Sequence, residues 1–230
     1  KIFLDTADIT EIRQWFDMGV IDGVTTNPSI MLKDRILDIE AGTKEITALL
    51  APLPLSVEVT TNDLEEMLIQ ARGFASWAPN IVVKIPQITA DGTPCYGVIK
   101  ALEAEDIRVN ATVAMSLGQV ILAAKAGATY ISLFYGRIAD EGGDAAAVIR
   151  DSVSWLGHWG FKSEIIVGSI RSVGDILGAA KAGAHVVTIA PQFLGKMADH
   201  KYTRETVRQF IADADKSLKL MEDLRARAQS

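Results

Sequence analysis

A lysine lies near the end of an otherwise apolar, strand-like stretch of the sequence, residues 80–86. Burial of an ammonium group favours its neutral form, and a neutral amine can attack a ketone to form a Schiff base. A lysine at a strand end can also pack its stem and extend its charged head into solvent. For Lys84 alone the second interpretation is the simpler one, so other residues must decide between the two.

Other polar residues also follow apolar stretches. If those stretches are parallel strands of one barrel, their carboxyl ends meet at a single mouth. An amine, two carboxylates, amides and hydroxyls gathered there suit cleavage of a carbon–carbon bond, in which an imine accepts electrons and a carboxylate removes a proton. The residues at these ends are Asp5, Thr25, Asn27, Glu58, Lys84, Asn110, Thr112, Ser132, Ser169 and Arg171.

Asp5 and Glu58 are the two candidate bases, and each has a simpler structural interpretation. Asp5 precedes a predicted helix and is a possible cap, but Asp8 is better placed for capping, which leaves Asp5 free. Glu58 can form a salt bridge with Lys84. Direct pairing would favour the charged amine and oppose nucleophilic attack, so we expect a water molecule between the two.

A phosphate site is predicted after the late strands. The segment Gly168–Arg171 lies between a strand and its helix, where barrels of this class commonly bind phosphate. Arg171 offers bidentate recognition, and Arg137 follows the preceding strand. Nearby, Asp140, Glu141 and Asp144 are interpreted as helix caps rather than metal ligands, and neither a metal nor a cofactor is predicted.

The elements that must position these residues alternate along the chain. Short Val- and Ile-rich stretches predict buried parallel strands, and the segments between them predict helices with Asp8, Asp63 and Asp144 as caps. We therefore predict a single α/β domain, residues 1–230, with a (β/α)₈ barrel. The eight expected strands span residues 2–5, 23–25, 55–60, 81–85, 107–110, 130–133, 164–168 and 185–189.

The chain ends in a predicted amphipathic helix over residues 203–228 that is longer than a barrel requires. It is expected to pack either on its own barrel or on a neighbouring subunit.

The composition limits the possible partners and location of the protein: the net charge is −6 and there is one cysteine. Nucleic acid and membrane partners are not expected, nor is a disulfide framework, and a cytoplasmic location is predicted.

Five segments together resemble the short form of the transaldolase family, which also contains the fructose-6-phosphate aldolases. They run in register with the predicted strands, and the resemblance extends from residue 2 to about residue 200. The segments are Phe3–Ala7, Gly23–Ser29, Val82–Pro86, Ile131–Arg137 and Val167–Arg171.

The resemblance implies a role for each candidate residue. Lys84 would form the Schiff base with a ketose phosphate, Asp5 would act as general acid and base, and Glu58 with Thr112 would hold a water molecule. Short members commonly form homo-oligomeric rings, pentamers or paired pentamers, and act in carbohydrate metabolism such as the pentose phosphate pathway. The dihydroxyacetone unit would be bound at Thr25, Asn27, Asn110 and Ser132, and the phosphate at Arg137, Ser169 and Arg171.

The resemblance also bears on the reaction. Aldolase members have Gln and Tyr where this chain has Glu58 and Phe134, so both residues favour a transaldolase that passes dihydroxyacetone from a ketose phosphate to an aldose phosphate. Two alternatives stay open at this point. One is an aldolase that releases free dihydroxyacetone, and the other is a sugar-phosphate isomerase that forms no imine.

Overall fold

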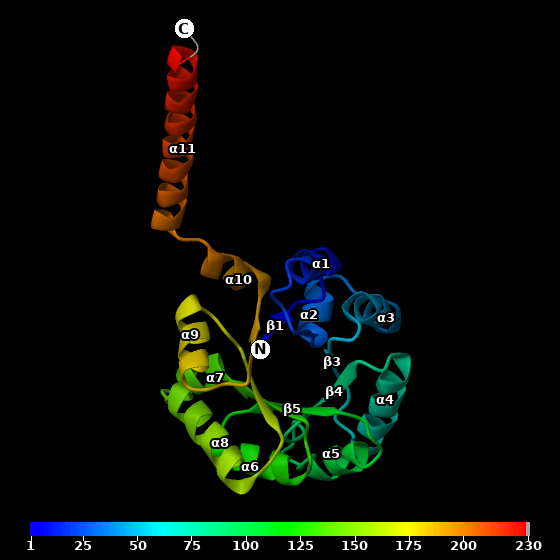
Figure 1. Ribbon diagram of the computed structural model, residues 1–230. Coiled ribbons are helices and arrows are strands. Elements are labelled where there is room, and N and C mark those ends of the chain that lie inside the picture. The colour runs from blue at the N-terminus through cyan, green and yellow to red at the C-terminus, as the bar shows by residue number, and fades with distance from the viewer. Residues whose placement is uncertain (229–230) are drawn as a thin grey trace. The chain divides into compact units, whose positions relative to one another are not determined.

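In the computed structural model, which describes residues 1–228, eight parallel strands close into a barrel in chain order, as expected (Figure 1). Each strand pairs with the next, and β8 pairs with β1. The predicted (β/α)₈ architecture is confirmed. The strands are β1 (Ile2–Asp5), β2 (Gly23–Thr25), β3 (Leu55–Glu58), β4 (Ile81–Pro86), β5 (Val109–Ala114), β6 (Tyr130–Phe134), β7 (Glu164–Gly168) and β8 (Val186–Ile189).

Helices lie outside the strands and surround them (Figure 1). The predicted caps Asp8, Asp63 and Asp144 each accept backbone N–H groups from the first turn of their helix, which typically stabilises a helix by about 1 kcal/mol. The helices of the barrel are α1 (Ile9–Asp17), α2 (Pro28–Lys33), α3 (Ile39–Leu50), α4 (Leu64–Trp77), α5 (Tyr96–Glu103), α6 (Leu117–Lys125), α7 (Tyr135–Asp140), α8 (Ala145–Trp159) and α9 (Val173–Lys181).

Asp140 was expected to cap a helix, and this expectation was wrong. It is the last residue of α7, where the free backbone groups are carbonyls that a carboxylate cannot accept from. Its oxygens instead receive hydrogen bonds from Arg171, with 2.6 Å between Nη2 and Oδ2.

The short helices α2 and α7 were not predicted, because six residues are too few to show a helical period.

The inside of the barrel is apolar at its amino-terminal half. One side chain from each of five strands forms a buried cluster there, namely Phe3, Val82, Tyr130, Ile166 and Val186. Successive side chains of a strand point to opposite faces, so the next inward position on each strand lies two residues further along. The residue two positions after each member of this cluster therefore also faces the inside of the barrel, closer to its mouth.

Strand β5 departs most from its predicted range. It extends to Ala114 rather than ending at Asn110, and its pairing with β6 shifts register between Ala111 and Ala114. This is the pattern of a β-bulge, in which two residues oppose one on the neighbouring strand. Val113 within it has φ = 61°, a conformation that β-branched residues rarely adopt. Thr112 lies within this bulge, two residues beyond Asn110 on the same strand.

A second unit begins at Leu194. The chain there contains most of α10 (Pro191–Ala198) and the whole of α11 (Lys201–Ala228). The long C-terminal helix was predicted, and α11 is 28 residues long. An exposed apolar row runs along it, with Val207, Phe210, Ile211, Leu218, Met221 and Leu224. Packing of this helix on its own barrel or on another subunit stays a prediction.

None of the helices within residues 1–228 has the length and hydropathy to cross a membrane.

Candidate active site

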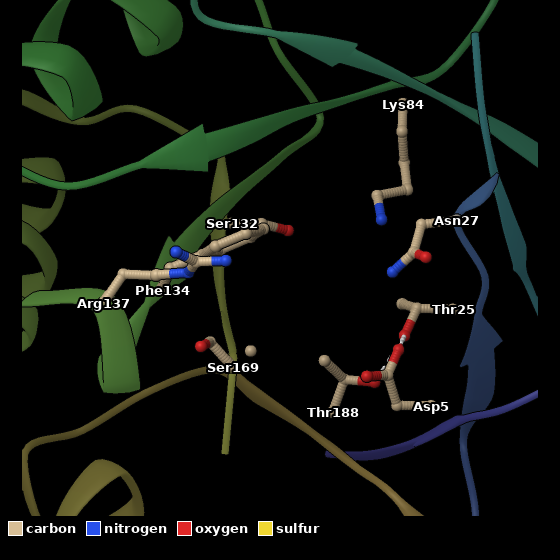
Figure 2. A pocket seen from close by; sticks show the side chains of 10 residues that line it. Asp5, Thr25, Asn27, Lys84, Ser132, Phe134, Arg137, Ser169 and Thr188 are labelled. Carbon is tan, nitrogen blue, oxygen red and sulfur yellow. Dashed lines mark hydrogen bonds between the residues drawn. The ribbon is translucent and has the colours of Figure 1, made fainter. Parts of the chain in front are cut away.

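A mostly polar layer lies above the apolar cluster, formed by the residues two positions further along the same five strands. The positions are Asp5, Lys84, Ser132, Gly168 and Thr188, and all five line one cavity of about 190 Å³. Thr25, Asn27, Phe134, Arg137 and Ser169 complete its lining. Figure 2 shows Asp5, Thr25 and Thr188 gathered on one side of the cavity, with Arg137, Phe134 and Ser169 on another.

Lys84 is almost completely buried, with 5% of its surface exposed. Its Nζ lies 2.9 Å from the carbonyl oxygen of Thr26 and 3.0 Å from Oε2 of Glu58. The interpretation that the lysine head reaches solvent is therefore wrong. A buried cation is costly unless it is paired and hydrogen-bonded, and these two oxygens supply both.

The expectation of a water molecule between Glu58 and Lys84 was also wrong. The two residues are direct partners in the pairing of β3 with β4, so their side chains leave the sheet on the same face and side by side. Their charged groups meet at 3.0 Å, a distance too short for an intervening water.

Asp5 is oriented by Thr25, whose hydroxyl donates a hydrogen bond to Oδ1 at 2.7 Å. Burial raises the pKa of the Asp5 carboxyl, while the charge of Lys84 and the Thr25 hydrogen bond act in the opposite direction. A raised pKa makes the carboxylate a stronger base. Since Asp8 caps α1, Asp5 is free for other work, as the sequence indicated.

On β5 and β6 the polar residues form a buried network. The Ser132 hydroxyl donates to Oδ1 of Asn110 at 2.7 Å, and Nδ2 of Asn110 donates to the Ser56 hydroxyl at 3.4 Å. The Thr112 hydroxyl is buried and has no hydrogen-bond partner within residues 1–228. A buried polar group of this kind is available to a substrate or a water molecule.

The predicted phosphate residues are brought together only in part. Arg137 and Ser169 line the cavity, whereas the guanidinium of Arg171 makes two hydrogen bonds to Asp140. Gly136 permits this packing. Its N–H donates to the Ser169 carbonyl at 3.0 Å, and a Cβ at Gly136 would lie 2.5 Å from that oxygen and 2.7 Å from Nε of Arg171.

Most of the predicted site residues therefore converge. Eight of them line the cavity, while Glu58, Asn110 and Thr112 are connected to it through Lys84, Ser132 and the β5 bulge. Within residues 1–228, no group of three or more His, Cys, Asp or Glu side chains is arranged to hold a metal ion.

Thr188 is the lining residue that the sequence analysis missed. In an apolar stretch a threonine looks like an ordinary strand former, because its branched side chain suits a β-strand. The available signal was its spacing. Thr188 stands two residues after the inward-facing Val186, which is the same offset that separates Lys84 from Val82.

Comparison with known proteins agrees with this geometry. A solved structure of a mandelate oxidase variant superposes with a TM-score of 0.57 at 20% identity, covering 80% of this chain and 59% of that one, which shows the barrel fold alone. Two relatives named probable transaldolase come from Dehalococcoides mccartyi, 42% identical over 93% of this chain and 97% of the relative, and Lactiplantibacillus plantarum, 43% identical over 93% and 95%.

The family model described as transaldolase/fructose-6-phosphate aldolase matches residues 2–229. With nearly the whole chain matched, the protein belongs to the transaldolase/fructose-6-phosphate aldolase family.

Proposed function

We propose that the protein is a transaldolase, which transfers a dihydroxyacetone unit from a ketose phosphate to an aldose phosphate through a Schiff base at Lys84. The observation that carries this proposal is a buried amine that lines a cavity, in contact with one carboxylate and across from a second. Relatives named probable transaldolase support the same activity.

The first step is imine formation. The amine of Lys84 must lose a proton before it attacks the ketone, and Glu58 at 3.0 Å is positioned to receive it. Nitrogen adds to the carbonyl carbon, the oxygen takes up a proton, and the resulting carbinolamine loses water to give the imine. We propose that Thr112, whose buried hydroxyl has no protein partner within residues 1–228, helps to hold the water involved.

The second step is cleavage. Asp5 removes the proton from the substrate hydroxyl one bond beyond the bond that breaks. That oxygen becomes the aldehyde of the departing aldose. The electron pair of the broken carbon–carbon bond moves into the imine, whose nitrogen is protonated, to give a neutral enamine on Lys84. The enamine then attacks an acceptor aldehyde, Asp5 returns the proton to the new hydroxyl, and hydrolysis of the imine releases the product.

Transfer is favoured over release of free dihydroxyacetone by two residues of the site. Glu58 contacts the reacting amine directly. Phe134 lines the cavity, where a tyrosine would offer a hydroxyl to orient a water molecule. Without that hydroxyl, water releases dihydroxyacetone from the enamine intermediate more slowly. The intermediate therefore lasts long enough to react with an acceptor aldehyde.

The donor sugar is proposed to lie between the two sides of the cavity. Thr25, Asn27, Asn110 and Ser132 would bind its hydroxyls. Arg137, Ser169 and Arg171 would bind its phosphate, and for this Arg171 must exchange Asp140 for the incoming phosphate. A cytoplasmic location and a place in the pentose phosphate pathway stay predictions.

The first test is reductive trapping. With fructose 6-phosphate and borohydride, we expect a covalent adduct on the peptide that contains Lys84, detected by mass spectrometry, and no adduct in Lys84→Met. A wild-type protein that gives no adduct with any ketose phosphate would rule out imine chemistry and favour an isomerase. Release of dihydroxyacetone without an acceptor aldehyde, at the rate seen with one, would favour the aldolase alternative.

Replacing Asp5 separates the two steps. Asp5→Asn should still be trapped by borohydride, since Lys84 keeps its partners, but turnover should fall by about 10²–10⁴-fold because a general base is lost. Normal turnover in this variant would remove Asp5 from the mechanism.

The same variant should be more stable than the wild type at neutral pH. Because the pKa of Asp5 is raised in the folded protein, its contribution to stability falls as pH rises from the ordinary carboxyl pKa through the raised one. The gain in unfolding free energy of Asp5→Asn, measured by urea denaturation, should therefore vanish below the ordinary pKa. A gain that is equal at all pH values would contradict this.

Asp140→Asn tests the competition at Arg171. Because an exposed ion pair is weak, its loss should lower KM for a ketose phosphate modestly, by up to about fivefold, and leave KM for an unphosphorylated ketose unchanged. Glu105→Gln, which breaks the bidentate pair with Arg72, is the matched control and should have no effect. A higher KM in Asp140→Asn would show that Asp140 holds Arg171 in place for phosphate binding.

The exposed apolar row of α11 supports a homo-oligomer, which we propose to be a pentamer or decamer. Sedimentation velocity of the full chain should give a mass that is a multiple of five subunits. The double substitution Phe210→Glu with Ile211→Glu should dissociate it, while Arg208→Glu on the same helix should not. A monomeric wild-type protein would refute the proposal.

A further inference from the structure

The position of Thr188 suggests a role that the proposed mechanism does not yet contain. Its side chain lines the cavity from β8, and its hydroxyl oxygen lies 2.5 Å from that of Thr25 on β2. Strand β1, which carries Asp5, lies between these two strands and pairs with both. The three side chains form a continuous chain of contacts, with dashed lines joining them in Figure 2.

Counting protons fixes the direction of this chain. An ionised carboxylate can only accept hydrogen bonds, and each hydroxyl has one hydrogen to donate. Thr25 donates its hydrogen to Oδ1 of Asp5. Thr25 can therefore interact with Thr188 only as an acceptor, so the Thr188 hydroxyl must be the donor. Two hydroxyls in series then point toward the Asp5 carboxylate, which lines the cavity.

Such an arrangement is cooperative. Accepting a hydrogen bond polarises the Thr25 hydroxyl and makes it a better donor to Asp5. It also fixes the rotation of that hydroxyl, which would otherwise be free to turn away. Gly168 leaves room for this arrangement, because a Cβ at that position would lie 3.3 Å from the Thr188 methyl group and crowd it.

We propose that Thr188 is a positioning residue that orients and polarises Thr25, and through it sets the direction and strength of Asp5 as the base of the cleavage step. This inference rests on the proposed function, because it assigns Thr188 to the same reaction. Thr188 does not contact Lys84 in this chain of bonds, and formation of the imine does not depend on it.

The expected effect on acid–base behaviour follows from the groups around Asp5. Its pKa is raised by burial and by the charge of Glu58, and lowered by the charges of Lys84 and Lys33 and by the hydrogen bond from Thr25. Loss of the Thr188 hydroxyl weakens that last contribution and leaves the others in place. The pKa of Asp5 should therefore rise further in Thr188→Val, a change that nearly preserves shape.

The first measurement needs no substrate. In protein labelled with ¹³C at the aspartate carboxyls, the Asp5 signal is assigned by its absence in Asp5→Asn and then titrated. We expect a higher midpoint in Thr188→Val than in the wild type, and a wild-type midpoint in Thr188→Ser, which keeps the hydroxyl. Identical midpoints in the wild type and Thr188→Val would overturn the proposal.

The second measurement is kinetic. Thr188→Val should slow cleavage by about two- to tenfold, because Asp5 loses part of its orientation and this loss outweighs the gain in basicity. The acidic limb of the rate profile should shift to higher pH. Borohydride trapping should proceed at the wild-type rate. Thr47→Val, which removes a buried hydroxyl bonded within α3, controls for a general effect of such substitutions and should change neither.

A double substitution tests whether Thr188 acts through Thr25. In a Thr25→Val background, adding Thr188→Val should cause no further loss, because the intermediary is already missing. If the loss of rate in the double variant were the product of the losses in the two single variants, Thr188 would act independently of Thr25, and the proposal would be refuted. Absence of trapping in the wild type would refute the proposed function instead, and the carboxyl titration would still report whether Thr188 acts on Asp5.

Discussion

The burial of the Lys84 amine is the constraint on which the rest of the site depends. A cation with 5% of its surface exposed is unfavourable unless oxygen atoms replace its water. Two oxygens replace water around this amine: the carbonyl of Thr26, which directly follows β2, and the carboxylate of Glu58 on β3. The same contact that stabilises the folded protein also gives the amine a neighbour that can take its proton. A direct ion pair opposes nucleophilic attack until the proton has moved. In the proposed mechanism Glu58 takes that proton, so pairing and activation need no separate residues.

The two-residue period of the strands brings the other groups to this amine. Below the mouth the inward positions are apolar, and one step further along the same strands they become Asp5, Lys84, Ser132 and Thr188. The apolar cluster excludes water from beneath the polar layer. Burial raises the pKa of Asp5, so the barrel that places this carboxylate also makes it a stronger base.

The sequence predicted the barrel and most of the site because both follow from local rules. Apolar stretches and aspartate caps fixed the elements, and the strand ends pointed to Asp5 and Lys84. Long-range geometry was harder to predict. The direct contact of Glu58 with Lys84 depends on the register between β3 and β4, and the partner of Arg171 depends on where α7 ends. Thr188 was missed although its spacing from Val186 contained the signal.

Three unfavourable features of the barrel lie at its mouth. Val113 adopts a left-handed conformation inside the β5 bulge, Asp5 is buried against its preference for water, and the Thr112 hydroxyl has no protein partner within residues 1–228. Each of these lowers stability, and local strain of this kind persists only where the surroundings hold it. The amino-terminal half of the barrel, with its apolar cluster of Phe3, Val82, Tyr130, Ile166 and Val186, contains none of them. The well-packed amino-terminal part of the barrel therefore offsets the cost of the mouth, where the proposed site lies, and the two layers are two residues apart along each strand.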